Sequence, residues 1–129
     1  MEKKPVIAIV DDDDSVREGL VDLVIAMGLR AEAFRCAEDF VRSLDVNQAD
    51  CLITDVRMPG MNGLDLLDHL LASGRSIPTI LITAFSQEAD RRRALGSGAI
   101  CYLSKPFKRS ALFACIRVAL SSDKQEKSS

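Results

Sequence analysis

Residues 6–14 read VIAIVDDDD, five apolar residues followed directly by four aspartates. The apolar run is too short for a helix, is rich in β-branched residues and begins after Pro5, so it predicts a buried β-strand. Downstream, apolar residues recur at helical spacing until Gly28, which offers a stop for a helix. These residues are Val16, Leu20, Leu23, Val24 and Met27. The chain is therefore predicted to begin with a strand, an acidic loop and a helix.

The alternation of strand and helix continues along the chain. Further strands are predicted at 30–34, 51–54, 79–82 and 99–103, with helices at 37–44, after the turn residues 60–63, at 87–95 and at 112–120. Helices between successive strands imply right-handed crossovers and a parallel sheet covered on both faces. The strands are largely apolar, as expected for parallel strands buried on both sides. We predict an α/β fold with a five-stranded parallel sheet of order 2-1-3-4-5 and five helices, a flavodoxin-like three-layer sandwich.

Polar side chains follow the predicted strands at the point where each one ends. Asp11 to Asp14 follow the first strand, Asp55 the third, Thr83 the fourth, and Ser104 and Lys105 the fifth. Sheets of this type bind ligands beyond the carboxyl ends of their strands, at the switch point between strands 1 and 3. Because parallel strands end at the same edge, we expect these side chains to converge there on one site.

The predicted site carries more negative than positive charge. Asp11, Asp12 and Asp55 repel one another, so at least one of their pKa values should rise unless a cation is present. Lys105 neutralises only part of this charge, and the excess requires a divalent ion. Carboxylate ligands without histidine or thiolate favour Mg²⁺, or Mn²⁺ as the alternative, over zinc.

The same residue types suit phosphoryl transfer, which needs a metal, a nucleophile in line, and cationic or hydroxyl groups on the phosphoryl oxygens. An aspartate carboxylate is a known phosphoryl acceptor. We assign Asp55 as the nucleophile and phosphorylation site. Asp12 and Asp55 would bind the metal directly and Asp11 through water, while Lys105 and Thr83 would hold the phosphoryl oxygens. Asp13 or Asp14 is expected to cap the following helix.

Four segments, taken in order, resemble bacterial two-component response regulator receiver domains, which have a CheY-like fold. They are the strand followed by Asp11-Asp12, residues 55–63 (DVRMPGMNG), Thr83-Ala84, and Lys105-Pro106-Phe107. Residues 55–63 fit the D-x-x-M-P-x-x-x-G pattern of that family at every fixed position, and the resemblance spans residues 5 to 120.

The resemblance implies a signalling switch that catalyses its own phosphorylation and dephosphorylation, with a phosphohistidine on a sensor histidine kinase as the donor. It implies that the backbone carbonyl of Arg57 is a further metal ligand and that the Lys105–Pro106 peptide is cis. Thr83 and Tyr102 occupy the positions that switch on phosphorylation, although Tyr102 could instead be an edge residue with its hydroxyl in water. Arg57 and Phe85 fall where the family tunes dephosphorylation. Phosphorylation would promote a homodimer through the fourth helix, fifth strand and last helix.

The segments 34–40 (FRCAEDF) and 15–17 (SVR) resemble the subfamily whose receivers precede a helix-turn-helix DNA-binding domain. We expect a receiver domain over 1–121 and a disordered tail or the start of a linker over 122–129, where apolar residues are almost absent. The chain is interpreted as part of a longer protein, with a stand-alone regulator as the alternative. With a net charge of −2, the chain itself gives no reason to expect nucleic-acid binding, so DNA contact would come from an absent effector domain.

Cysteine and histidine placement argues against a zinc site. The four cysteines form no C-x-x-C pair, and His69, the one histidine, lies off the apolar stripe of its helix and is expected to be exposed. Reduced cysteines, together with the lack of an apolar run near about 18 residues, predict a cytoplasmic protein without a membrane partner.

Three alternatives compete with this interpretation. A haloacid-dehalogenase-type phosphatase also uses an aspartate nucleophile, and Asp11-x-Asp13 imitates its motif, but the chain offers no cap region. A phosphorylation-independent interaction module of the same fold is disfavoured because reactive residue types fill every key position. A flavin mononucleotide binder is disfavoured because the acidic loop after the first strand would repel a phosphate.

Overall fold

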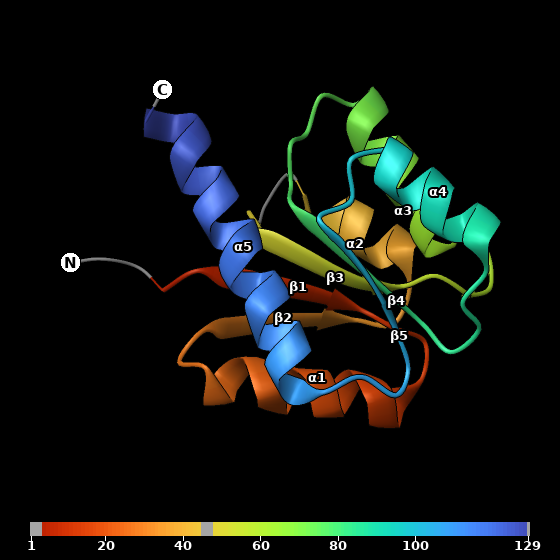
Figure 1. Ribbon diagram of the computed structural model, residues 1–129, viewed down its shortest axis with the longest axis horizontal. Coiled ribbons are helices and arrows are strands. Elements are labelled where there is room, and N and C mark those ends of the chain that lie inside the picture. The colour runs from red at the N-terminus through yellow and green to blue at the C-terminus, as the bar shows by residue number, and fades with distance from the viewer. Residues whose placement is uncertain (1–3, 45–47, 129) are drawn as a thin grey trace.

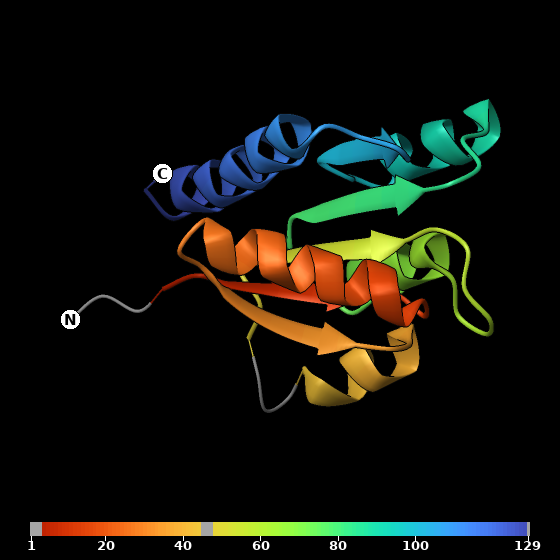
Figure 2. The same cartoon turned by 90° about the horizontal axis from the view of Figure 1, so that it is seen from below.

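Five parallel strands form one sheet in the order β2-β1-β3-β4-β5 in the computed structural model, which describes residues 4–44 and 48–128, the last seven by backbone alone. The strands are β1 (Val6–Val10), β2 (Arg30–Phe34), β3 (Cys51–Asp55), β4 (Thr79–Thr83) and β5 (Cys101–Ser104). Each neighbouring pair is parallel. The strand arrowheads in Figure 2 accordingly point toward one edge of the sheet. The predicted topology is confirmed.

Five helices connect and cover the strands, giving three layers (Figure 1). They are α1 (Asp14–Ala26), α2 (Ala37–Ser43), α3 (Gly63–Ala72), α4 (Glu88–Gly96) and α5 (Arg109–Ser128). Helices α1 and α5 pack on one face of the sheet, and α2, α3 and α4 on the other. Gly28, expected to stop α1, has φ +82°, a conformation that glycine adopts without strain.

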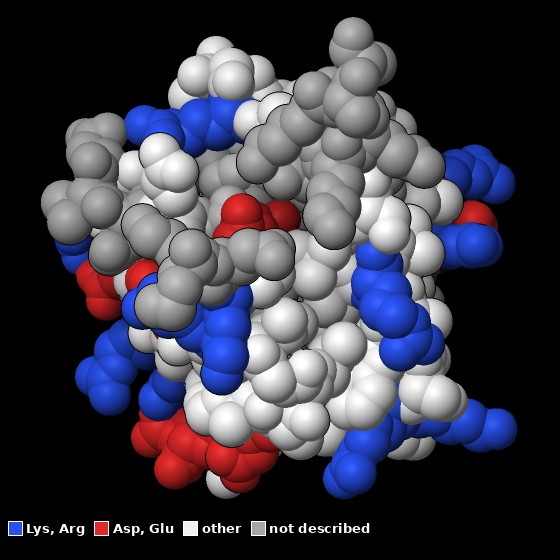
Figure 3. All heavy atoms as spheres, turned by 90° about the vertical axis from the view of Figure 1, so that its left-hand side faces the viewer, with Lys and Arg blue, Asp and Glu red and all other residues white. Residues whose placement is uncertain are grey.

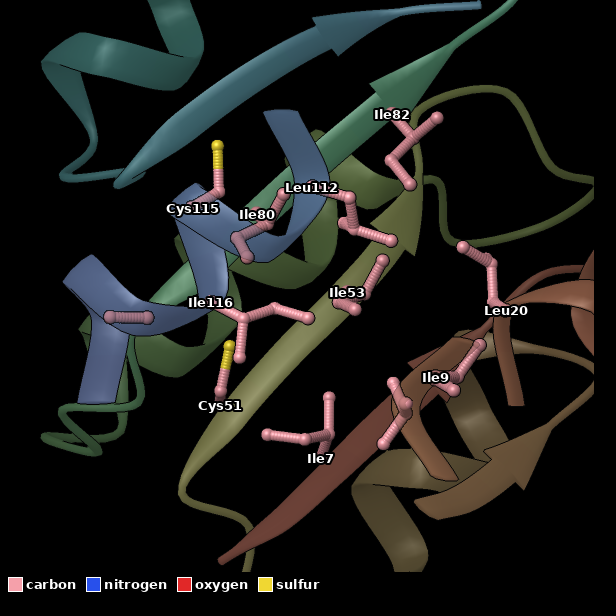
Figure 4. Packing of buried hydrophobic residues seen from close by; sticks show 12 residues of the cluster. Ile7, Ile9, Leu20, Cys51, Ile53, Ile80, Ile82, Leu112, Cys115 and Ile116 are labelled. Carbon is pink, nitrogen blue, oxygen red and sulfur yellow. The ribbon is translucent and has the colours of Figure 1, made fainter. Parts of the chain in front are cut away.

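The core beneath α1 and α5 is built mainly from isoleucine and leucine. Figure 4 shows Leu112 and Ile116 of α5 lying over Ile53 of β3, and Leu20 of α1 beside Ile9 of β1. All five side chains are buried. Burying each such side chain contributes about 1.5–3 kcal/mol to the free energy of folding. The carboxyl ends of these strands are therefore held in place by a well-packed core.

Helix α4 is attached differently from the other helices. Within the described residues, Ala94 is its buried residue, and its remaining positions are mostly polar. The guanidinium of Arg93 lies 3.2 Å from Asp65 and 2.8 Å from Asp68, both on α3, and Ser97 donates a hydrogen bond to Asp68 at 2.8 Å. Polar contacts therefore hold much of α4 against the domain.

Two element boundaries differ from the sequence prediction. The fifth strand begins at Cys101 rather than at residue 99, because the backbone N–H of Ala99 donates to the carbonyl of Ala94 and completes the end of α4. The last helix continues to Ser128, past the expected end at 120, since charged and amide side chains such as Lys and Gln are compatible with a helix. The division into 1–121 and 122–129 stays a prediction, because the side chains beyond Ser121 lie outside the described residues.

The surface agrees with the balanced charge of the sequence. Figure 3 views the side opposite the strand arrowheads, where Lys and Arg side chains lie in separate groups around the described part of that face. Among the residues that the structure describes, no helix has the combined length and apolar character that crossing a bilayer requires.

Candidate functional site

The register of the sheet brings the predicted site residues to one edge. Val10 pairs with Thr54, so Asp11 and Asp55 are the next two positions on adjacent strands β1 and β3. On the other side of β3, Asp55 pairs with Ile82, which places Thr83 one position beyond it. Thr83 in turn pairs with Ser104, and Lys105 follows directly. The predicted convergence at the carboxyl edge is confirmed.

Three carboxylates form a cluster at this edge. One oxygen atom from each of Asp11, Asp12 and Asp55 lies within 4.8 Å of the other two. Asp11 is 1 % exposed and its Oδ2 atom has no hydrogen-bond partner, whereas Asp12 is exposed and Asp55 is half-buried. The Lys105 ammonium lies 3.8 Å from this Oδ2 atom. A buried carboxylate oxygen that accepts no hydrogen bond, beside two further carboxylates, fits a hard divalent cation, which takes oxygen ligands.

The environment of the cluster opposes full ionisation. Burial raises the pKa of Asp11, and the neighbouring charge of Asp55 raises it further, against a backbone hydrogen bond from Asp13 and the charge of Lys105. Burial also raises the pKa of Asp55, which Lys105 and backbone N–H groups partly offset. The expectation that at least one pKa in the cluster rises is confirmed, because charge is crowded where water is excluded.

The acidic loop after β1 has an internal structure that fixes Asp11. Its Oδ1 atom accepts a hydrogen bond from the Asp13 backbone at 2.9 Å, and its carbonyl accepts one from Arg17 at 2.8 Å. Asp13 caps α1, because its side chain accepts from the Val16 backbone at 3.1 Å. Of the two cap candidates, Asp13 is thus the cap, and Asp11 and Asp12 remain for the cluster.

On the other side of Asp55, the site residues at the ends of β4 and β5 have defined local conformations. Thr83 is buried, and its hydroxyl accepts from the Phe85 N–H at 3.1 Å and donates to the Phe85 carbonyl at 3.2 Å. The Lys105–Pro106 peptide is cis, as expected. The hydroxyl of Tyr102 is buried without a hydrogen-bond partner, so it does not lie in water. His69 is exposed, as predicted.

The sequence did not reveal a close approach at the start of α3, nor a contact made by the loop between β3 and α3. A Cβ atom on Gly63 would lie 2.3 Å from the Asp55 carbonyl oxygen, so glycine is required at this position. The Glu38 carboxylate of α2 accepts a hydrogen bond from the Met61 backbone at 2.9 Å, and this bond lowers the pKa of Glu38. Glu38 lies in the segment 34–40 and Met61 in the segment 55–63, but the sequence of neither segment indicated that these two residues are in contact.

A second missed contact runs from the same loop to α4. The Arg57 guanidinium forms an ion pair with Asp90 and donates a hydrogen bond to the Gln87 side chain at 3.2 Å. Its backbone N–H donates a long hydrogen bond of 3.4 Å to the Asp55 Oδ1 atom. Arg57 therefore connects the acidic cluster with α4.

The fold and site define a structural class: a doubly wound α/β domain with an acidic cluster, flanked by a lysine, at the switch point of its sheet. Comparison with known proteins identifies the family. Residues 7–117 match the response regulator receiver domain family. The chain belongs to this family.

Its relatives include transcriptional regulators. The chain is 40 % identical over 126 residues to the response regulator protein TmoT of Ectopseudomonas mendocina, covering 98 % of this chain and 57 % of TmoT. It is 37 % identical to the transcriptional regulatory protein FixJ of Azorhizobium caulinodans, covering 87 % of this chain and 53 % of FixJ. The chain thus spans about half the length of these curated relatives. It is a receiver domain related to those of transcriptional regulators.

Solved structures of related proteins share the fold of this chain. The response regulator StyR superposes with a TM-score of 0.89 at 40 % identity, over 97 % of this chain and 63 % of StyR. The structure of FixJ-N gives a TM-score of 0.84 at 30 % identity, over 93 % of this chain and 96 % of that one. The Vibrio cholerae chemotaxis protein CheY4, at 21 % identity and a TM-score of 0.83 over 91 % of this chain and 99 % of CheY4, shares the fold.

Proposed function

We propose that this receiver domain accepts a phosphoryl group on Asp55 from the phosphohistidine of a sensor histidine kinase, in a reaction that requires Mg²⁺, and that it then switches conformation to control a transcriptional output. The observation that carries the proposal is the cluster of three carboxylate oxygens within 4.8 Å of one another. Neither the phosphatase nor the phosphorylation-independent module is favoured by the family to which the chain belongs.

Four groups would hold the cation: the carboxylates of Asp11, Asp12 and Asp55 and the backbone carbonyl of Arg57. The fit rests on the donor set, which consists of oxygen atoms, and on the buried Asp11 Oδ2 atom, which accepts no hydrogen bond. Mn²⁺ has the same preference for oxygen ligands and is the alternative. The bound ion would neutralise charge on the cluster and on an incoming phosphoryl group.

The chain's own residues would perform the transfer. A carboxylate oxygen of Asp55 forms a bond to phosphorus as the bond from phosphorus to the donor histidine nitrogen breaks, and that nitrogen takes up a proton. The Lys105 ammonium, already 3.8 Å from Asp11, would move its contact to a phosphoryl oxygen. The Thr83 hydroxyl would exchange its Phe85 contacts for another phosphoryl oxygen. Such positioned charges stabilise the transferring group.

The switch would follow from this movement of Thr83. Tyr102 packs against the cluster of apolar residues that includes Ala94 of α4, and its hydroxyl has no hydrogen bond to lose when the ring changes position. We place the output on the surface of α4, β5 and α5, with a phosphorylation-dependent homodimer as the product. The protein would act in the cytoplasm, and DNA would be contacted by an output domain, as in relatives such as the DNA-binding transcriptional regulator NtrC of Proteus hauseri.

Mass spectrometry of the protein treated with a small phosphodonor tests the proposal. We expect one added phosphoryl group in the presence of Mg²⁺, located on Asp55, and none in Asp55→Asn or after the metal is chelated. Asp22→Asn, a substitution of an exposed aspartate on α1, should leave labelling unchanged. A phosphoryl group on Asp11 would favour the phosphatase instead, and labelling that is independent of Mg²⁺ would contradict the role of the cluster.

A further inference from the structure

Arg57 joins two parts of the domain that are distant in sequence. Its guanidinium binds Asp90 and Gln87 on the first turn and N-cap of α4, whereas its backbone lies against the Asp55 carboxylate. The Asp90 side chain is 15 % exposed and that of Arg57 47 % exposed, so water is partly excluded from the pair. An ion pair in such a setting holds its partners more firmly than one fully in water.

The amino end of α4 depends on this contact. The carboxyl half of the helix is fixed by buried Ala94 and by the contacts of Arg93 and Ser97 with α3. The first turn contributes no buried residue among those described, and its side chains are Glu88, Ala89 and Asp90. Through Asp90, this turn holds the guanidinium of Arg57 against α4.

We propose that Asp90 is a positioning residue for the divalent cation site. It anchors the Arg57 side chain on α4 and thereby fixes the Arg57 backbone beside Asp55, where its carbonyl is available as a ligand. This inference rests on the proposed function, since it concerns the same cation. By thermodynamic reciprocity, a cation that requires the anchored Arg57 stabilises the position of the first turn of α4, and a partner that displaces this turn weakens cation binding.

Simple electrostatics and a positioning role predict opposite changes in Mg²⁺ affinity when the Arg57 side chain is replaced. Without a positioning role, removing the Arg57 charge should tighten Mg²⁺ binding, because a cation near the cluster is lost, and removing the Asp90 charge should weaken it. With a positioning role, both Arg57→Met and Asp90→Ala weaken Mg²⁺ binding. The double variant should then bind no more weakly than either single variant, because each substitution breaks the same contact.

Glu88 provides a matched control. It lies in the same first turn of α4, carries the same charge, and forms its ion pair with Arg92 at 3.9 Å rather than with the loop. Glu88→Ala therefore reproduces the loss of charge and of the favourable interaction with the helix dipole, but keeps the Arg57 anchor. Arg57→Lys retains a cation for Asp90 and serves as the conservative rescue.

The experiment is a Mg²⁺ titration of the metal-free protein, followed by amide chemical shifts in NMR, for the wild type, Asp90→Ala, Arg57→Met, the double variant, Glu88→Ala and Arg57→Lys. Loss of an outer-shell contact to a metal ligand commonly costs tenfold or more in affinity, and we expect about three- to tenfold for both single variants and the double. Glu88→Ala should stay within about twofold of the wild type, and Arg57→Lys should lie closer to the wild type than Arg57→Met. Melting curves in chelator establish that each variant is folded.

Three results would overturn the inference: tighter Mg²⁺ binding by Arg57→Met, equal effects of Asp90→Ala and Glu88→Ala, or additive losses in the double variant. In each case the wild type still binds Mg²⁺, and the proposed function stands. A wild-type protein that shows no response to millimolar Mg²⁺ would overturn the proposed function itself, and this inference with it.

Discussion

Replacing Asp55 by asparagine should stabilise the metal-free domain at neutral pH. The substitution keeps the size of the side chain and removes one charge from a group of carboxylates whose oxygens lie within 4.8 Å of one another. Burial and crowding already raise the pKa of both Asp11 and Asp55, so the folded state holds these charges at a cost.

The magnitude follows from the distance. Two unit charges 4.8 Å apart repel by roughly 3.5 kcal/mol at an effective dielectric constant of about 20. The lost attraction between Asp55 and Lys105 cancels part of this gain. We expect a net increase of about 1–2 kcal/mol in the free energy of unfolding, or about 3–6 °C in melting temperature.

The pH dependence provides a second test, whose sign follows from proton binding. Because the folded pKa of Asp55 is raised, the folded wild type binds the proton more tightly than the unfolded chain does. Its stability therefore falls as pH rises from the ordinary carboxyl value through the raised one. The advantage of Asp55→Asn should be small at about pH 3, where the aspartate is mostly protonated in both states, and larger at about pH 7.

Urea unfolding in chelator at the two pH values measures both effects, with Asp22→Asn on the exposed surface of α1 as the control. Adding Mg²⁺ should stabilise the wild type and not Asp55→Asn. An Asp55→Asn protein that is less stable than the wild type without metal, or whose advantage does not change with pH, would refute the crowding explanation.

Three further substitutions separate structural from chemical roles. Gly63→Ala should destabilise the domain by about 1–3 kcal/mol or more in urea unfolding, because its Cβ would lie 2.3 Å from the Asp55 carbonyl oxygen. Gly19→Ala in α1, where the added Cβ meets open space, should be neutral or stabilising. Equal effects of the two substitutions would contradict the close approach. Lys105→Ala should slow phosphorylation measured by mass spectrometry and change Mg²⁺ affinity less than Asp12→Ala does, and a comparable loss of affinity would count against the assigned roles. Glu38→Ala should leave the Met61 N–H without its partner and lower the free energy of unfolding, because the hydrogen bond between them is lost. The neighbouring Asp39→Ala, which loses an exposed ion pair, should lower it less, and equal stabilities of the two variants would mean that the loop does not need this bond.

The central strands β1, β3 and β4 could be predicted because most of their residues are buried, whereas the edge strands β2 and β5 are half-buried or exposed and were predicted from the alternation of strands and helices. An apolar run such as 6–10 is stable only when its side chains are buried in a core. Because a helix follows each strand, only a few strand orders of a parallel sheet are possible. The convergence of Asp11, Asp55 and Lys105 followed from the same topology, since each residue stands directly after the last residue of a strand or at its end. Burial and topology together thus specified most of the candidate site.

The contacts of the loop after β3 could not be predicted in this way. Glu38 and Met61 are 23 residues apart and Arg57 and Asp90 are 33 apart, and both pairs depend on the path of an irregular loop. Charged side chains at such positions look like ordinary surface residues in sequence. The start of β5 was missed for a related reason, because Ala99 is apolar like a strand residue but its N–H completes the turn that ends α4.

Anomalous diffraction from crystals of this domain grown with Mn²⁺ tests the central claim most directly, because it locates the cation without reference to activity. We predict one strong anomalous peak bound by the side chains of Asp12 and Asp55, with Asp11 in contact directly or through water, and its loss in Asp55→Asn. Crystals that show no peak at these carboxylates, or in which the three side chains point away from one another, would contradict the account.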